Sequence, residues 1–287
     1  MIEAFKNYLK QKNLAKSSIA SYTRHANYFL QWLQQINNSG ENFVYNDLLD
    51  FMRYCKAEEL SKKYTNNILL GIRHYCDFLM LKKSRKDNPV AGIFIKGIER
   101  KLPINLLTEE EMESLYKQYS MQIHVSNSKK IMLGLLVYQG LTAGEIMRIK
   151  QHHIKLQDGK IFIKGTAKTN ERILDLQALQ VTALQKYLQE SNFNSEVIFL
   201  NTAMNTSAKK NINNRLQYIF EQLKKINQKV INPVQIRSSV ITLWLQKNNL
   251  RQVQYMAGHK YVSSTERYQT NNLEDLQNEL QQHHPMK

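Results

Sequence analysis

Three side chains near the C-terminal end of the sequence have the types and spacing to act together on a phosphodiester. Arg237 lies in an apolar helical run, the pair Gly258 and His259 follows it, and Tyr268 comes last. Arg237 precedes His259 by 22 residues, and His259 precedes Tyr268 by 9 residues. These spacings leave room for a helix, a second short helix, a turn and a third helix. We therefore expect such elements to bring the three side chains together.

These residue types suit nucleophilic attack on phosphorus. A tyrosine hydroxyl has an ordinary pKa near 10, so it attacks well only when its proton is removed and the charge growing on the phosphate oxygens is neutralised. Arginine stays charged and its planar fork can hold two phosphate oxygens, while histidine can donate a hydrogen bond or shuttle a proton. Attack by Tyr268 would leave a covalent phosphotyrosine, which requires no nucleotide. The sequence contains no GxxxxGK(S/T) loop.

The motif around these residues resembles that of the tyrosine recombinase or phage integrase family, whose members include Xer-like and mobile-element integrases. The pair IR ending at Arg237, the triplet AGH ending at His259 and the run SSTERY ending at Tyr268 occupy matching positions. The resemblance implies a site-specific DNA recombinase, used in integration, excision or resolution, that works through a 3′-phosphotyrosine. Arg237 would clamp the phosphate and His259 would assist by hydrogen bonding or proton transfer. No cofactor is implied.

The resemblance also implies a lysine on a β-hairpin that protonates the leaving 5′ oxygen. Lys164 gives the closest match, in the run IKG. Lys168 is a second candidate, because the hairpin length differs between family members. A lysine at a hairpin tip is more often a solvated charge, so both assignments rest on the resemblance.

Two positions depart from the family's pattern. Thr142 stands in GLTAGE where the family's GLRxxE has its first catalytic arginine, and Val234 stands where the family has a histidine. A threonine brings no charge, so the transition state would lose on the order of 3 kcal/mol of stabilisation or more. Arg172 is a candidate substitute if the predicted hairpin folds over the site. Arg148 is a second, although it lies about 240° round a helix from Thr142.

These departures keep a second interpretation open, namely a DNA-binding accessory protein of the same fold with weakened catalysis. A third is that Thr142 was introduced deliberately to trap a complex. A type IB topoisomerase shares the chemistry, but nothing in the sequence favours relaxation over strand exchange. The presence of Arg237, His259 and Tyr268 together favours the enzyme, because a protein that only binds DNA requires no nucleophile.

The composition favours a polyanionic partner. The 287 residues include 40 Lys and Arg against 24 Asp and Glu, for a formal net charge of +16. We expect this partner to be double-stranded DNA. Cys55 and Cys76 are the only cysteines, and both fall in helical patterns, which argues against a disulfide framework. With no run of 18 apolar residues and no apolar leader, we expect a cytoplasmic protein with no membrane partner. No histidine, cysteine or carboxylate cluster implies a metal.

Helical periodicity and short β-branched runs predict a mainly α protein of two domains. Residues 1–86 hold four helical segments and resemble the family's N-terminal core-binding domain. Residues 87–105 read as a basic interdomain linker. Residues 106–287 read as a mixed α/β catalytic domain with a small antiparallel sheet, opening at a capping box of Thr108 and Glu111.

The linker region carries the predicted DNA contacts. Seven basic residues stand against two acidic residues between Leu81 and Leu102. Such a segment could lie along a DNA backbone or be a solvated connection, and the two-domain layout favours a clamp that closes round a duplex. The predicted DNA-binding residues are Lys82, Lys83, Arg85, Lys86, Arg100 and Lys101.

Assembly is predicted from the reaction and from the sequence after Tyr268. Recombination joins two duplexes, so the resemblance implies a homotetramer on two DNA sites. Leu273, Leu276 and Leu280 form an apolar stripe on a predicted tail helix. In the family such a helix is exchanged between protomers, and the alternative is that it packs on its own domain.

Overall fold

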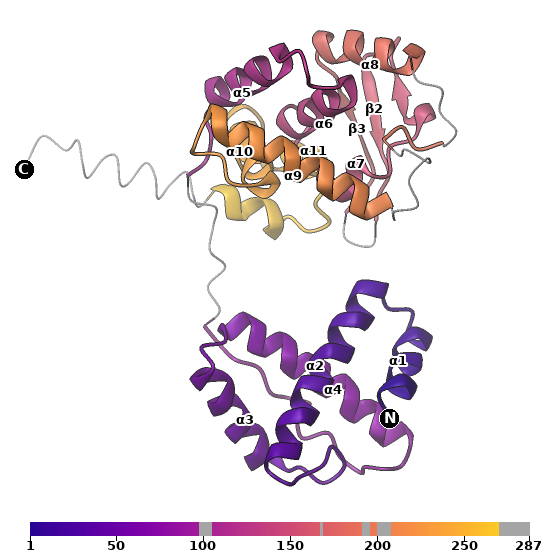
Figure 1. The fold of residues 1–287 in the computed structure, drawn as a ribbon, viewed down its shortest axis with the longest axis vertical. Helices are drawn as coiled ribbons and strands as arrows, with labels where there is room; N and C mark the ends of the chain where they lie inside the picture. The colour runs from indigo at the N-terminus through magenta and orange to yellow at the C-terminus, as the bar shows by residue number, and fades with distance from the viewer. Residues whose placement is uncertain (98–104, 167–168, 191–195, 200–207, 270–287) are drawn as a thin grey trace, which may run out of the picture. The chain divides into compact units, whose positions relative to one another are not determined.

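The computed structural model describes residues 1–97, 105–166, 169–190, 196–199 and 208–269, with the backbone alone for 208–211. The chain divides into two compact units, residues 1–100 and 101–287. Figure 1 shows α1 to α4 in the first unit and α5 to α11 with the strands in the second. This confirms a mainly helical protein with a small antiparallel sheet. Among the described residues, no helix is both long enough and apolar enough to cross a membrane.

Helices alone make up the regular structure of the first unit in its described part. The closest packing is between α2 and α4, where Gly71 permits the approach because a Cβ there would lie 2.7 Å from the Cβ of His25. The core beside them is aromatic, and Phe29 meets both Phe43 and Phe51 edge-on. The helices are α1 (Ile2–Gln11), α2 (Lys16–Gln35), α3 (Tyr45–Ala57) and α4 (Lys62–Leu81).

The segment after α4 packs onto the first unit. Arg73 donates to the backbone oxygens of Val90 and Ile93 at 3.1 and 2.8 Å. Asn66 exchanges two hydrogen bonds with the backbone of Ile95. Because side chains of α4 satisfy these backbone groups, the segment is part of the unit. The unit therefore continues past the boundary expected at residue 86, into the range expected to be linker, residues 87–105.

Arg85 is held inside the first unit and is not free to contact DNA. The residue is 8% exposed. Its guanidinium donates to the backbone oxygens of Glu41, Phe43 and Asp87, and lies 4.3 Å from the ring centroid of Phe43. Our expectation of a DNA contact from Arg85 is therefore corrected, because the side chain ties the loop before α3 to the segment after α4. The exposed basic residues beside it are Lys82, Lys83 and Lys86.

Replacing Arg85 with methionine is expected to lower the free energy of unfolding of the first unit by about 3 kcal/mol, because several buried carbonyls lose their donor. Trp32 is buried in this unit and Trp244 lies in the other. Urea titration followed by tryptophan fluorescence in a Trp244→Phe background therefore isolates the first unit. The matched control Lys86→Met changes an exposed neighbour, and we expect an effect within about 0.5 kcal/mol. Equal stability of the two variants would contradict this role.

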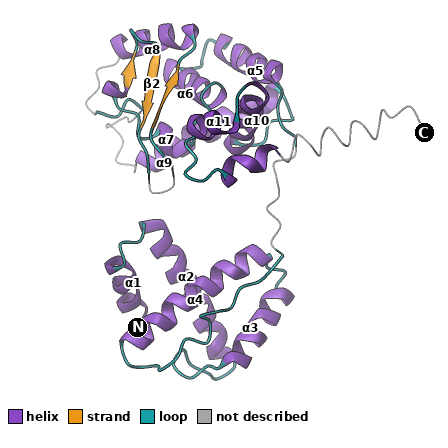
Figure 2. Cartoon of the chain, turned by 180° about the vertical axis from the view of Figure 1, so that it is seen from behind, coloured by secondary structure: helices purple, strands orange, loops and turns teal. Residues whose placement is uncertain are grey.

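The second unit combines helices with a three-stranded antiparallel sheet in the order β1-β2-β3, in which Ile161 pairs with Leu174 (Figure 2). The predicted hairpin corresponds to β2 and β3, and β1 is a two-residue addition. The capping box expected between Thr108 and Glu111 is present at the start of α5. The elements are α5 (Glu109–Met121), α6 (Asn127–Val137), α7 (Ala143–Ile146), η1 (Gln151–His153), β1 (Ile154–Lys155), β2 (Lys160–Ile163), β3 (Arg172–Asp175), α8 (Ala178–Glu190), α9 (Ala208–Ile226), α10 (Pro233–Lys247) and α11 (Leu250–Ala257). Residues 263–269 are also helical.

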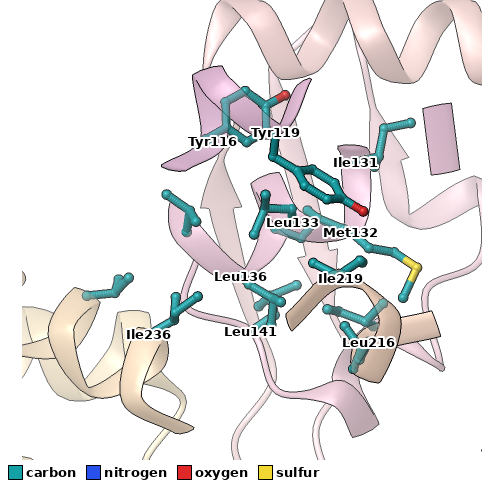
Figure 3. Packing of buried hydrophobic residues seen from close by; sticks show 14 of the residues in the cluster. Tyr116, Tyr119, Ile131, Met132, Leu133, Leu136, Leu141, Leu216, Ile219 and Ile236 are labelled. Carbon is teal, nitrogen blue, oxygen red and sulfur yellow. The ribbon is translucent and has the colours of Figure 1, made fainter. Parts of the chain in front are cut away.

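The core of the second unit surrounds α6. Residues 131–137 of this helix are all buried, because α6 contacts α5, α8, α9 and α10. Figure 3 shows Leu133 and Leu136 among Tyr119 of α5 and Ile219 of α9. A helix packed on so many sides has its end fixed in place. The loop that follows α6 is therefore delivered to a defined position, and it carries part of the site.

Candidate active site

Capped helix ends determine where the chain turns around the predicted trio of Arg237, His259 and Tyr268. Asn232 caps α10 by accepting a hydrogen bond from the N–H of Gln235, and Pro233 occupies the first turn, where its missing N–H is harmless. Asn249 caps α11 in a similar way. Gly258 ends α11 in the left-handed conformation, with φ of 68°. These local signals place Arg237 early in α10 and His259 directly after α11.

The guanidinium of Arg237 is held between two backbone carbonyls. Nη1 donates to the oxygen of Gly140 at 2.5 Å, and Nη2 donates to the oxygen of Ala257 at 2.6 Å. The side chain is 12% exposed, so it is almost enclosed but still reaches the surface. Arg237 thus joins the loop after α6 to the end of α11, and its orientation is fixed before any ligand binds.

Glu145 is the anionic centre of the site, and it was not among the residues predicted from the sequence. Its side chain is 1% exposed. Oε1 accepts from Nη1 of Arg172 at 2.7 Å, and Oε2 lies 3.8 Å from Nη1 of Arg237. Burial raises the pKa of Glu145, but Arg172, Arg237 and the N–H of Thr142 together outweigh burial and hold the pKa below its ordinary value. The Thr-x-x-Glu pattern of a capping box was the available signal.

Arg172 lies beneath Gly258 and supports the site from its buried side. A Cβ at position 258 would overlap Nη1 of Arg172 and lie 3.0 Å from its Cζ, so this contact and the positive φ both require glycine. The Arg172 side chain has no exposed surface. Its Nε and Nη2 have no hydrogen-bond partner among the described residues. Its charge therefore acts within the site and does not face solvent.

The rings of His259 and Tyr268 lie together. Their centroids are 6.1 Å apart and their planes differ by 12°. Burial, followed by the charges of nearby arginines, lowers the pKa of His259 to about 4, so the ring is neutral at pH 7. Nδ1 of His259 lies 2.9 Å from Oγ1 of Thr265. The Tyr268 side chain packs against a small apolar cluster of Ile241, Val253 and Ala257.

The hairpin of β2 and β3 is bonded to the loop that carries His259. Thr169 and His259 form an isolated antiparallel bridge, and the N–H of Asn170 donates to the oxygen of Gly258 at 3.0 Å. The hydroxyl of Tyr255 on α11 accepts from the N–H of Ile173 at 3.0 Å. The hairpin and the end of α11 are thus positioned by each other.

Lys164 follows β2 and is exposed. Burial is the main cause that lowers the pKa of His153, and the charge of Lys164 is close enough to contribute. The structure therefore places the charge of Lys164 within electrostatic range of the buried ring of His153.

Several predicted residues lie outside the described part of the chain. Lys168 is one, and Arg100 and Lys101 of the basic segment are two others. The predicted tail helix, within residues 270–287, is also outside it.

Comparison with known proteins assigns this arrangement to a family. The phage integrase family matches residues 105–274, which is more than half of the chain. The chain belongs to the phage integrase family. The family's N-terminal SAM-like domain also matches, over residues 2–83.

Relatives in this family align with nearly the whole chain. The tyrosine recombinase XerC of Oceanobacillus iheyensis is 24% identical over 295 residues, which covers 99% of this chain and 95% of that protein. XerC of Staphylococcus aureus is 24% identical over 272 residues, covering 93% and 90%. The XerH site-specific recombinase bound to a palindromic difH substrate is 20% identical with a TM-score of 0.72, covering 93% of this chain and 80% of that one. The Tn1549 transposon integrase in complex with a circular intermediate DNA is 13% identical with a TM-score of 0.69, covering 93% and 94%. These two structures show the same fold.

The two positions at which we expect a departure from the family's pattern are both defined in the structure. Thr142 caps α7, and its hydroxyl donates to Oε2 of Glu145 at 2.9 Å. Val234 is 68% exposed on the first turn of α10. Arg148, one candidate substitute, extends over Gly144 of α7. Thr142 therefore serves the local helix and brings no charge to the site.

Replacing Arg172 with methionine is expected to lower the free energy of unfolding of the second unit by about 3 kcal/mol, because Glu145 would stay buried without its closest ion-pair partner and would keep only the more distant Arg237. Urea unfolding at pH 7, followed through Trp244 in a Trp32→Phe background, measures this unit. The matched control Lys186→Met removes an exposed ion pair with Glu190, and we expect it to change the free energy of unfolding by less than about 0.5 kcal/mol.

The same variant should change the response of the second unit to acid. The pKa of Glu145 is lower in the folded chain than its ordinary value of 4.5. The ionised carboxylate therefore stabilises the folded state above pH 4.5, and this stabilisation is lost as the pH falls through the pKa of the folded chain. In Arg172→Met, Glu145 keeps its burial and loses its closest ion-pair partner, so acid should narrow the stability gap between wild type and variant. A gap that does not change with pH would contradict the ion-pair role.

Proposed function

We propose that this protein is a site-specific DNA recombinase that cuts and rejoins strands through a 3′-phosphotyrosine at Tyr268. The observation that carries the proposal is the meeting of Arg237, His259 and Tyr268 at one site in a member of the phage integrase family. The relatives named XerC and the solved recombinase complexes with DNA support double-stranded DNA as the partner. The net charge of +16 supports the same partner.

In the proposed cleavage step, the phenolic oxygen of Tyr268 forms a bond to phosphorus while the bond from phosphorus to the 5′ oxygen breaks. The phenolic proton passes to solvent. The leaving 5′ oxygen keeps the electron pair of the broken bond and takes a proton from Lys164. Arg237 neutralises the charge on the non-bridging oxygens, and His259 adds a hydrogen bond. Rejoining is the reverse step with the 5′ hydroxyl of another strand. The phosphotyrosine conserves the bond energy.

The proposed reaction also requires several copies of the protein to assemble on DNA. Strand exchange between two duplexes calls for one nucleophile at each of four cut strands, so we propose a homotetramer on two sites. Lys82, Lys83 and Lys86 are exposed and suited to phosphate contacts, which would make binding depend on salt. Exchange of a C-terminal helix between protomers stays a prediction.

A nicked duplex tests the proposal. Binding sites are first selected with the protein from a random duplex library, and a nick is then placed so that the short strand diffuses away after cleavage. Religation is blocked, and a covalent protein–DNA complex should accumulate and survive a denaturing gel. Mass spectrometry should find the nucleotide on the peptide that contains Tyr268. Tight binding without any covalent complex would sink the proposal.

The second candidate is an accessory protein that binds DNA with the same fold and catalyses weakly or not at all. The observation that favours it is the engagement of Thr142 with Glu145, which leaves the site without the charge that the family pattern provides. Sequence-specific binding in the selection, with no covalent complex on the nicked duplex, is the result that this candidate predicts.

A further inference from the structure

Thr265 contacts the imidazole of His259 and has no part in the cleavage step proposed above. The residue is 0% exposed and lies in the helical segment 263–269. Its Oγ1 lies 2.9 Å from Nδ1 of His259, and its N–H donates to the oxygen of Val262 at 2.7 Å. The hydroxyl is therefore enclosed and directed at one edge of the imidazole.

The direction of the hydrogen bond between Thr265 and His259 follows from the acceptor that the hydroxyl proton of Thr265 requires. A neutral imidazole has one N–H and one bare nitrogen. If Nδ1 carried the proton, the hydroxyl of Thr265 would accept it and would need a different acceptor for its own proton. Among the described residues, the hydrogen bond recorded for Oγ1 is the one to His259. Because a buried donor without an acceptor is costly, the hydroxyl donates to a bare Nδ1, and Nε2 carries the proton.

The surroundings of His259 leave these two neutral tautomers as the relevant states. Burial and then the charges of the neighbouring arginines lower the pKa of the ring to about 4, against the opposing charge of Glu145. The ring of Tyr268 lies nearly parallel to the imidazole, with the centroids 6.1 Å apart. Among the described residues, the charged and titratable groups around the ring include Arg237 from α10, Arg172 from β3, Glu145 from α7, and Arg267 and Tyr268 from residues 263–269.

We propose that Thr265 is a positioning residue that holds His259 as an Nε2–H hydrogen-bond donor. During strand cleavage, Nε2–H then donates to a non-bridging phosphate oxygen, and the ring takes no proton from Tyr268. This role in cleavage rests on the proposed function, whereas the tautomer is a property of the free protein.

Nitrogen-15 NMR of the intact chain with labelled histidine reads the tautomer without any DNA. The sequence has 8 histidines, and the signals of His259 are those that disappear in His259→Gln. At pH 7 we expect a proton-bearing Nε2 and a bare Nδ1. A proton on Nδ1 of His259 would overturn the proposal.

Two variants connect the tautomer to the reaction. Thr265→Val removes the hydroxyl at similar shape, and we expect a mixture of tautomers and an about tenfold slower formation of the covalent complex. Thr265→Ser keeps the hydroxyl and should stay within about twofold of wild type. Thermal melting checks that both variants fold.

The outcomes separate this inference from the proposed function. Slower reaction in both variants with an unchanged tautomer would mean that Thr265 only packs, and would overturn the inference. So would a valine variant that equals wild type in both tautomer and rate. If wild type forms no covalent complex, the proposed function fails, and the NMR comparison of the valine and serine variants still decides whether the hydroxyl sets the tautomer.

Discussion

Replacing Tyr268 with phenylalanine is expected to abolish the covalent protein–DNA complex while leaving folding and DNA binding nearly unchanged. The phenolic oxygen is the atom that would bond to phosphorus, so the rate should fall on the order of 10⁴-fold or more. The phenyl ring can keep its stack on His259 and its packing against α10 and α11. The measurement is the denaturing gel with the nicked duplex, paired with a binding titration and a melting curve.

Tyr261 provides a matched control for this experiment. It lies 7 residues before Tyr268 in the same motif and is 73% exposed. Tyr261→Phe should give wild-type amounts of covalent complex. If Tyr268→Phe still forms the complex at a comparable rate, another nucleophile is at work and the assignment of Tyr268 is wrong.

Replacing Thr142 with arginine is expected to accelerate formation of the covalent complex by about 10²–10³-fold. One preorganised donor aimed at developing charge is worth about this much in other active sites. The new guanidinium would arise from the cap of α7, beside Glu145 and Arg237, where it could lie next to the phosphate that we propose Arg237 holds. The substitution removes the threonine cap, which costs about 1 kcal/mol of stability. Single-turnover kinetics on the nicked duplex at low salt would measure the gain.

A glutamine at the same position separates charge from the loss of the cap. Thr142→Gln also removes the threonine hydroxyl and adds a long side chain, but it adds no charge, so it should gain less than about tenfold. Equal rates for the arginine, glutamine and wild-type proteins would show that the missing charge does not limit this site. An arginine variant that becomes active from an inactive wild type would instead support the accessory-protein interpretation of the natural chain.

The proximity of Arg237, His259 and Tyr268 could be predicted from the sequence because each residue lies in a local motif, whereas their catalytic roles stay predictions. The caps, the left-handed glycine and the short α11 are local signals that place His259 directly after the helix that follows α10. The fold class was likewise predictable from periodicity. The pairing of Glu145 with Arg172 was not, because it depends on how α7 and the sheet pack, across 27 residues of sequence.

The error at Arg85 has a related cause. In the sequence it is one of several basic residues in a row, and its neighbours Lys83 and Lys86 are indeed exposed. Its burial is decided by the carbonyl of Phe43, which lies 42 residues earlier. The start of the linker was misjudged for the same reason, because side chains of α4 bind the backbone of a segment whose composition resembles a loop.

The contact between Arg237 and Gly140 spans 97 residues, and Tyr268 follows every other member of the site in the chain. During synthesis the ribosome therefore releases Glu145 and Arg172 first, Arg237 and His259 later, and Tyr268, the proposed nucleophile, last. Under the proposed function, a growing chain that has folded only its first unit lacks the group that would bond to DNA. The order of residues would thus keep a chain that ends before Tyr268 from attaching itself covalently to DNA.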